Sequence, residues 1–369
     1  MNQTVASMLR ERRVAAGLSQ AELAARTKVT RQTVNSIETG KYTPGTEISL
    51  RLAAALNCRV DDIFRLADVS SKSDCVSAEP LTIGDRVALG RVGERVVAHR
   101  LSGPRIAPDD FVAADAHAAT DGVSLLIPEH QLERTILIAG CDPSLSILAA
   151  FVARKSPEHR IVPLHSPSEA ALRELADGLV HVAGSHLPDA PRGDSNISHA
   201  RRALARGGGL VVSYATWEQG IVVAPGNPKR IRTLAHLARP DVRIVNRDPG
   251  SGSRRLLDDG LLAAGVTPNK VRGYETVVPT HMAVARSVHA GVADAGIALR
   301  AVAHAFDLDF VPLAELRFDL VIPDQHLEHP TVRVMLEVLQ SRNFRADLAA
   351  LPGYEVSRTG ATLLEMKAA

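Results

Sequence analysis

The chain has few aromatic residues, few cysteines and no long apolar run. Aromatic residues make up 3% of its 369 residues, which argues against a single-stranded nucleic-acid surface built on base stacking. The cysteines, Cys58, Cys75 and Cys141, are odd in number, widely spaced and without a Cys-x-x-Cys pair. They predict neither a disulfide framework nor a zinc site. We expect reduced thiols, no metal and no cofactor.

Signals for membranes, export and catalysis are missing as well. No apolar run approaches the length that crosses a bilayer, and the opening MNQTVASMLRERR lacks the apolar core and cleavage site of a signal peptide. The sequence therefore predicts a cytoplasmic protein with no membrane partner. No Gly-x-Ser-x-Gly elbow, His-Glu-x-x-His pair or Walker loop occurs, so catalysis on a small ligand stays a remote alternative.

The most informative segment is LSQAELAARTKVTRQTVNSIETGKYTP, residues 18–44. Ser19 can cap a helix whose Glu22 reaches back in a capping box. After a short polar turn, Thr30 can cap a second helix over residues 31–38, in which Val34 and Ile37 point inward at a three-residue interval. The segment therefore predicts two crossed helices joined by a tight turn.

The second helix turns polar side chains outward. Arginine can pair with guanine, Gln or Asn with adenine, and Thr can touch a thymine methyl in a major groove that admits one helix. Lys41 and Tyr42 follow where a phosphate would pass. The predicted DNA-contacting residues are Gln20, Arg31, Gln32, Thr33, Asn35, Ser36, Lys41 and Tyr42.

Charge and family resemblance support double-stranded DNA as a partner. Residues 1–66 hold ten Lys/Arg against six Asp/Glu, a net charge of +4 in a chain whose total is +2. Residues 4–66 resemble the Cro/phage-repressor, or XRE, helix-turn-helix class, and this resemblance implies a five-helix all-α domain. Two capped helices can also be a mere packing unit, but the polar, basic outward face favours DNA.

The rest of the chain predicts further units. Residues 67–80 are small and polar and indicate a linker, and residues 81–132 alternate as two or three antiparallel strands that form a lid or a spacer. From residue 133 to 369, short apolar strands alternate with helices, as a mostly parallel α/β structure requires. We expect two sheets in two lobes, roughly residues 133–215 plus 310–369, and residues 220–305.

This second half resembles the type II periplasmic-binding-protein fold over about residues 133–360. The likeness rests on NRDPGSGSRRLLD (246–258), GVADAGIAL (291–299) and RFDLVIP (317–323), in the order found in cytoplasmic molybdate-binding-like domains that are fused to DNA-binding heads. The resemblance implies a small-molecule ligand in a cleft between two lobes.

Residues 249–253, Pro-Gly-Ser-Gly-Ser, follow a predicted strand and open a helix. Glycines let the backbone approach a ligand, and free N–H groups and the helix dipole favour an anion. The predicted contacts here are Ser251, Gly252, Ser253 and Arg254, with Arg255 as the alternative cation. An ordinary Gly-Ser turn with a capping serine is the competing interpretation.

The equivalent turn of the other lobe carries Cys141, Asp142 and Ser144. Molybdate binders usually have Ser or Thr here, and Asp142 would repel a dianion unless it only caps the helix. Capping and ligand contact remain open, and contact would indicate a zwitterionic ligand. The other expected ligand-binding residues are Ser185, His186, Trp217, Thr280, His281 and Asp294. Trp217 either packs on the ligand or fills the seam between the lobes, and Asp294 is expected at the cleft floor or hinge.

These features predict a one-component transcription regulator. A homodimer or higher even oligomer would place two recognition helices on a palindromic operator, and a small anionic or zwitterionic effector, such as an oxyanion, carboxylate or sulfonate, would bind in the cleft. The alternative is a DNA-binding repressor whose second domain serves only dimerisation or partner contact.

Overall fold

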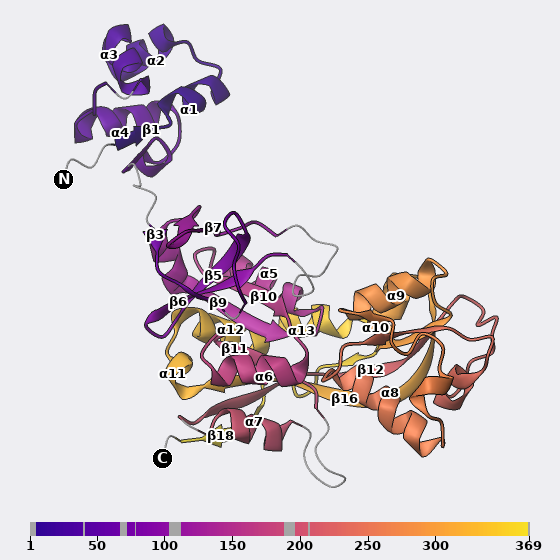
Figure 1. Cartoon of the computed structure of the whole chain (residues 1–369). Coiled ribbons are helices and arrows are strands. Elements are labelled where there is room, and N and C mark those ends of the chain that lie inside the picture. The colour runs from indigo at the N-terminus through magenta and orange to yellow at the C-terminus, as the bar shows by residue number, and fades with distance from the viewer. Residues whose placement is uncertain are drawn as a thin grey trace. The chain divides into compact units, whose positions relative to one another are not determined.

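The computed structural model describes residues 5–39, 41–66, 72–77, 79–102, 112–187, 196–205 and 207–367 (Figure 1). The chain divides into two compact units, Met1–Ser71 and Lys72–Ala369, called here the N-terminal and the C-terminal unit. Within the described ranges, no helix combines the length and the apolar character that crossing a membrane would need.

The N-terminal unit is helical. Its helices are α1 (Leu9–Ala15), α2 (Gln20–Thr27), α3 (Arg31–Glu38), α4 (Thr46–Ala55) and the 3-10 turn η1 (Val60–Asp62). The predicted starts of α2 and α3 are confirmed, because Ser19 and Thr30 are their N-caps. A fifth α-helix was expected, but this position holds only the single turn η1. A two-stranded pairing of β1 (Val5–Ser7) with β2 (Phe64–Leu66), which the sequence did not predict, joins both ends of the unit.

The C-terminal unit begins with a small sheet of six strands in the order β3-β8-β7-β5-β6-β4. The strands are β3 (Lys72–Ser73), β4 (Val76–Ser77), β5 (Arg86–Val92), β6 (Arg95–Arg100), β7 (Ala116–Ala119) and β8 (Gly122–Leu125). The linker predicted over residues 67–80 is therefore longer than the structure allows, since β3 and β4 lie within this range and pair with β8 and β6. Ala88, Val97 and Leu101 of this sheet share a core with the strands that follow.

The main sheet has ten strands. Its path is β10-β9-β11-β16-β12-β15-β13-β14, and β17 and β18 pair with β12. The strands are β9 (Thr135–Gly140), β10 (Arg160–His165), β11 (Val182–Ser185), β12 (Gly209–Val223), β13 (Ile244–Arg247), β14 (Val277–Val278), β15 (Ala295–Leu299), β16 (Asp309–Pro323), β17 (Tyr354–Glu355) and β18 (Thr362–Met366). As predicted, β9, β10 and β11 are parallel to one another, and β13 is parallel to β14 and β15.

Two long antiparallel strands, β12 and β16, run through both lobes and join them (Figure 1). The two separate sheets expected from the sequence are therefore one continuous sheet. The first lobe carries α5 (Leu145–Lys155), α6 (Ser168–Ala176), α7 (Ile197–Ala203), α11 (Asp324–Leu327), α12 (Pro330–Gln340) and α13 (Arg342–Ala349). The second lobe carries α8 (Gly252–Ala263), α9 (His281–His289), α10 (Arg300–Ala305) and the 3-10 turns η3 (Leu234–Ala238) and η4 (Pro268–Lys270). The remaining 3-10 helix, η2 (Glu129–Arg134), leads into β9.

Candidate functional site

The outward face of α3 is polar and open to solvent. Arg31, Gln32 and Asn35 are exposed, whereas Thr33 and Ser36 are half-buried. Val34 and Ile37 point inward and are fully buried, so the face that remains is the one that the spacing predicted. A helix that displays Arg, Gln and Asn together can contact base edges in a major groove.

Gln20 links α2 to α3. Its Nε2 donates to Glu38 Oε2 at 2.9 Å and to Asn35 Oδ1 at 3.4 Å, and Arg13 Nε donates to Glu38 Oε1 at 2.6 Å. Burial would raise the pKa of Glu38, but the hydrogen bonds from Arg13 and Gln20 lower it. This ion pair between α1 and α3, which the sequence did not indicate, fixes the angle at which α3 is presented.

The turn after α3 displays two more predicted DNA contacts. Lys41 and Tyr42 are exposed, and their backbone N–H groups donate to the carbonyl of Ser36 at 2.8 and 3.1 Å. At the other end of α3, the hydroxyl of Thr33 lies 2.8 Å from that of Thr30, the N-cap residue. The eight predicted residues therefore lie on α2, on α3 and in the following turn of one unit.

A second group of polar residues lies between the lobes of the C-terminal unit, at the carboxyl ends of strands. The sulfur of Cys141 and ring nitrogens of His186 and His281 all lie within 4.8 Å of one another. Arg247 Nη2 is 3.5 Å from Nε2 of His165. We call the set of residues gathered here the Arg247 cluster: Cys141, His165, His186, Trp217, Arg247 and His281. All of them are buried except His165, which is half-buried.

Strand topology explains this convergence. Cys141 follows β9, His165 ends β10 and His186 follows β11 in the first lobe, while Arg247 ends β13 in the second. Parallel strands bring their carboxyl ends to one edge, where ligands of open α/β sheets collect. Thr280 is the N-cap of α9, where its hydroxyl accepts from Ala283 N at 2.9 Å, and it places His281 at the same edge.

Arg247 is the unusual member of the cluster. Its side chain is 1% exposed, and among the described residues Nε and Nη1 have no hydrogen-bond partner. Burial lowers the pKa of Arg247, although Cys141 and Asp248 act in the opposite direction. A buried guanidinium is normally paired with an anion, because its desolvation is costly.

The imidazoles around Arg247 are neutral. Burial and the nearby guanidinium lower the pKa of His165 and that of His186 to about 3, and the pKa of His281 is lowered by the same two causes. Each neutral ring carries one N–H donor and one lone pair. Nδ1 of His186 and both ring nitrogens of His281 are buried and lack a partner within the described part of the chain.

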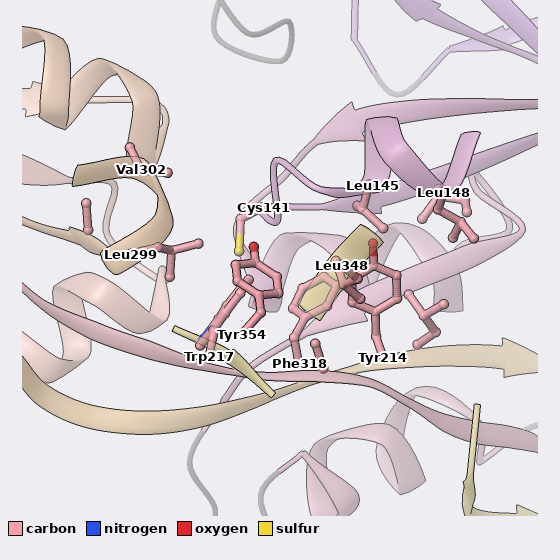
Figure 2. Packing of buried hydrophobic residues seen from close by; sticks show 14 of the residues in the cluster. Cys141, Leu145, Leu148, Tyr214, Trp217, Leu299, Val302, Phe318, Leu348 and Tyr354 are labelled. Carbon is pink, nitrogen blue, oxygen red and sulfur yellow. The ribbon is translucent and has the colours of Figure 1, made fainter. Parts of the chain in front are cut away.

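Aromatic packing closes the cluster on one side. Trp217 lies edge-on to His186 at 5.2 Å between ring centroids and to His281 at 6.1 Å. Figure 2 shows Cys141, Trp217, Phe318 and Tyr354 gathered over the two long strands. Gly252, at the start of α8, lies so close to His186 that an added Cβ would be 2.2 Å from its ring.

The Gly-Ser turn before α8 has partners of its own. Ser251 is the N-cap and accepts from Arg254 N at 3.2 Å, and Ser253 Oγ accepts from Gln219 Nε2 at 2.6 Å. Arg254 points away from the cluster, because its guanidinium stacks on Tyr274 and bonds Asp258. The arginine that lies in the cluster is therefore Arg247 and not Arg254, the cation predicted from the sequence.

Asp142 is engaged inside the first lobe. Its Oδ1 accepts from Ser144 N, Ser144 Oγ and Tyr354 OH at 2.7–2.8 Å, and burial raises its pKa to about 6. The Ser144 hydroxyl also lies 2.9 Å from that of Tyr214. The contacts of Oδ1 are those of a turn cap, whereas Oδ2 is buried without a hydrogen-bond partner among the described residues, so contact with a ligand stays a prediction.

Two further predicted residues lie outside the cluster. Ser185 donates to Asn196 Oδ1 at 3.1 Å within a buried network. Asp294 precedes β15, accepts from Arg243 N at 2.8 Å and lies 3.6 Å from Lys229 Nζ. Because Asp294 precedes β15, which is parallel to β13, it lies at the opposite edge of the sheet from Arg247. This position does not fit the cleft floor, and the hinge, the other place expected for Asp294, stays a prediction.

A cavity of about 360 Å³ adjoins the cluster. Cys141, His165, Thr280 and His281 form part of its wall, and most of the remaining wall is apolar. Pockets of roughly 300–1,000 Å³ hold small molecules in proteins, so the space is adequate for a small ligand.

Comparison with known proteins agrees with this division. Residues 149–340 match the PBP superfamily domain, and residues 9–63 match the helix-turn-helix family. YvgK, an uncharacterized protein of Bacillus subtilis, is 34% identical over 232 residues, which are 62% of this chain and 74% of YvgK. An HTH-type transcriptional regulator of Methanothermobacter thermautotrophicus is 42% identical over 67 residues, 18% of this chain and 97% of that protein.

The molybdate-binding protein ModA of Mycobacterium tuberculosis is 38% identical over 93 residues, which are 24% of this chain and 33% of ModA. The fold and the two matches define a Cro/XRE-type DNA-binding domain followed by a two-lobed PBP-like domain. The chain belongs to the PBP superfamily.

Proposed function

We propose that the chain is a one-component transcription regulator whose C-terminal unit senses a small anion. The observation that supports this most is Arg247, a buried cation without a hydrogen-bond partner on Nε or Nη1 among the described residues, at the strand ends where ligands collect. Two neutral imidazoles beside it, those of His186 and His281, have ring nitrogens without a partner among the described residues and can each donate one hydrogen bond to the same anion.

An anion suits this site for two reasons. It would neutralise the buried guanidinium in a place where water is excluded and charge-assisted hydrogen bonds are strong. It would also give partners to ring nitrogens of His186 and His281 that have none within the described residues. A zwitterion stays an alternative ligand, because only Oδ1 of Asp142 is engaged with Ser144 and Tyr354, whereas its Oδ2 is buried without a partner among the described residues.

The relatives suggest which anions to try first. ModA is by name a molybdate-binding protein, so tetrahedral oxyanions such as molybdate, tungstate and sulfate head the list. The adjoining cavity of about 360 Å³ also has room for small carboxylates and sulfonates. Arg247, His165, His186 and His281 are the proposed ligand-binding residues, and Ser251, Gly252 and Ser253 shape the lobe that contacts them.

The N-terminal unit supplies the output. We place Arg31, Gln32 and Asn35 on base edges and Lys41 and Tyr42 beside the phosphates. A homodimer would bind a palindrome whose half-sites lie about 34 Å apart, one turn of DNA, or a multiple of it. Since it acts on the chromosome, the regulator would work in the cytoplasm.

Ligand and DNA binding would be linked through the separation of the two recognition helices. An anion that binds the closed lobes more tightly than the open lobes shifts that equilibrium, and the coupling free energy is the same in both directions. Typical couplings change affinity by about 5–150-fold.

The test has two stages. A thermal-shift screen with oxyanions, carboxylates and sulfonates identifies the ligand, since an anion at a hundred times its dissociation constant adds about 2.7 kcal/mol of stability. Operator DNA, selected from random duplexes, is then titrated with and without that anion. We expect operator affinity to change at least about fivefold. Intact DNA binding with no response to any anion would contradict the proposal and leave a dimerisation role for the C-terminal unit.

A further inference from the structure

Cys141, His186 and His281 have the chemistry and placement of metal ligands. One thiol and two imidazoles come from three different elements, the turn after β9, the end of β11 and the start of α9. All three residues are buried, and the three potential ligand atoms lie within 4.8 Å of one another. Ligands bonded to one metal at about 2.0–2.3 Å would be roughly 3.5–3.7 Å apart, so side-chain movements of about 1 Å would bring them together.

The ring nitrogens are also free to coordinate. His186 Nδ1 and both nitrogens of His281 are buried without a hydrogen-bond partner among the described residues. Metal-binding histidines coordinate through one ring nitrogen, and the unpartnered nitrogens of His186 and His281 are available for this role. His281 could bind through either nitrogen and use the other as a donor to a second ligand.

The positive charge of Arg247 disfavours metal ions that would add further positive charge beside it. A Cys–His–His site is suited to soft or borderline ions such as Cu⁺ and Zn²⁺. Zn²⁺ with one thiolate adds a net positive charge beside a buried guanidinium, whereas Cu⁺ with one thiolate adds none. Trp217 and Phe318 pack against His186, with ring centroids 5.2 and 6.4 Å from its own, and Cys141 lies near the same aromatic residues (Figure 2). This apolar packing limits access of water to the metal from one side.

We propose that Cys141, His186 and His281 form a three-coordinate site for one Cu⁺ ion. The thiol of Cys141 gives its proton to solvent as the sulfur–copper bond forms, and the ion enters and stays as Cu⁺, so no electrons are exchanged. The metal must displace that proton, so binding strengthens as pH rises. Because the copper–thiolate pair is neutral, Arg247 keeps its charge for an anion. With copper on His186 Nδ1 and on one nitrogen of His281, the anion is left with Arg247 and the second nitrogen of His281.

The chain offers a matched set of thiols for the test, since it has three cysteines and the other two are Cys58 and Cys75. The full-length protein is titrated anaerobically with Cu⁺ in competition with bathocuproine disulfonate, a chelator whose copper complex is coloured. The wild type and the double variant Cys58→Ser/Cys75→Ser are expected to withhold one Cu⁺ per chain. Loss of a supporting contact around a metal costs about 10–100-fold in affinity, so Cys141→Ser, which removes a ligand, should cost more than about a hundredfold.

Variants of the imidazoles and of Arg247 complete the test. His281→Asn should weaken Cu⁺ binding without touching a thiol, which keeps the proposal testable if Cys141→Ser folds poorly. Arg247→Met should keep the copper and strengthen Zn²⁺ binding at least about tenfold, because a repelling charge is gone. That variant is also expected to lose the anion, so failure of the copper site and failure of anion sensing give different results.

Three results would overturn the proposal. The first is Cu⁺ binding of equal strength in the wild type and in Cys141→Ser. The second is loss of binding in the Cys58→Ser/Cys75→Ser variant, which would place the copper at another thiol. The third is a wild-type protein that yields all its copper to the chelator.

Discussion

The outward face of α3 and the Arg247 cluster are both rich in hydrogen-bonding groups, but they differ in exposure. Arg31, Gln32 and Asn35 lie in solvent, so water satisfies them until DNA replaces it. Arg247 and His281 are buried, and within the described residues several of their nitrogens have no partner. The outward face of α3 releases water when it binds DNA. The Arg247 cluster is preorganised, and its unpaired nitrogens gain hydrogen-bond partners from the ligand.

This difference has an energetic consequence. Exposed side chains on α3 contribute little to folding, and their replacement should change stability by less than about 0.5 kcal/mol. A buried unpaired cation lowers the stability of the empty protein. Binding of a ligand at the cluster should therefore stabilise the protein strongly. Substitutions in the cluster should lower ligand affinity without lowering the stability of the ligand-free protein.

The largest expected effect is that of Arg247→Met. Methionine fills similar space without charge, so we expect anion affinity to fall more than about a hundredfold, since truncating a charge at a buried ionic contact costs about 2–5 kcal/mol. The ligand-free variant should be as stable as the wild type or more stable by about 1–4 kcal/mol. Calorimetric titration and urea unfolding measure the two effects, and a variant that is much less stable would show that Arg247 has a structural partner.

Gly252→Ala tests the contact between the lobes. The added Cβ would meet the His186 ring at 2.2–3.0 Å, and such overpacking costs about 1–3 kcal/mol. We expect anion affinity to fall about 5–150-fold, because the imidazole must move. Gly207→Ala is the control, since its Cβ would meet nothing within 4 Å. Equal effects of the two substitutions would contradict the role given to Gly252.

Gln32→Ala tests the exposed face. A base-contacting side chain contributes about 1–3 kcal/mol of discrimination, so operator affinity should fall about 5–150-fold. Anion-induced thermal stabilisation should stay as in the wild type. Electrophoretic mobility shift and thermal-shift measurements on the same preparation check both. Loss of the anion response in Gln32→Ala would contradict the assignment of DNA binding to the N-terminal unit and of anion binding to the C-terminal unit.

A smaller effect concerns buried imidazoles elsewhere. His181, His326 and His329 lie together, with ring centroids 5.0 and 5.1 Å from His181. Burial and the neighbouring rings lower the pKa of His181 to about 3, and burial and neighbouring imidazoles lower those of His326 and His329 to about 4. Their unfolded value is about 6.5. Stability is therefore complete above pH 6.5 and is lost as the pH falls toward about 4, by up to roughly 1.4 kcal/mol per unit for each group.

His329→Asn isolates one of these groups. Asparagine can still cap α12, where His329 Nδ1 accepts from Thr331 N at 3.2 Å. Between pH 7.5 and pH 5, the wild type should lose up to about 2 kcal/mol more stability than the variant. Burial raises the pKa of Asp319 to about 6, an opposite effect that both proteins share and that cancels in the difference. A pH profile of His329→Asn that equals that of the wild type would contradict the assignment.

The two regions also differ in how much the sequence could predict. Ser19, Thr30, Val34 and Ile37 act within one or two turns of helix, so spacing alone located α2 and α3 and their outward face. The alternation of strands and helices predicted the two-lobed α/β unit, but not that β12 and β16 would merge both lobes into one sheet. That continuity depends on hydrogen bonds between segments about 100 residues apart.

The Arg247 cluster was found only in part. Cys141, His186, Trp217 and His281 follow recognisable strand ends or crossovers, and each was predicted singly. The cation was predicted at Arg254 in the first turn of α8 instead of at Arg247. Arg247 is the last residue of β13, and the carboxyl end of a strand is where ligands of α/β sheets collect, so its position was a usable signal. His165, the last residue of β10, carries the same signal and was also missed. The spacing of residues in the sequence cannot predict that His165 lies 3.5 Å from the guanidinium of Arg247, which is 82 residues away in the chain.

The most direct measurement is a calorimetric titration of the wild type and of Arg247→Met with the anion that stabilises the wild type most. The account predicts one saturable site per chain in the wild type and no detectable binding in the variant, while both bind operator DNA when no anion is present. Equal anion affinity in the two proteins would show that the ligand binds elsewhere and would contradict the central role of Arg247.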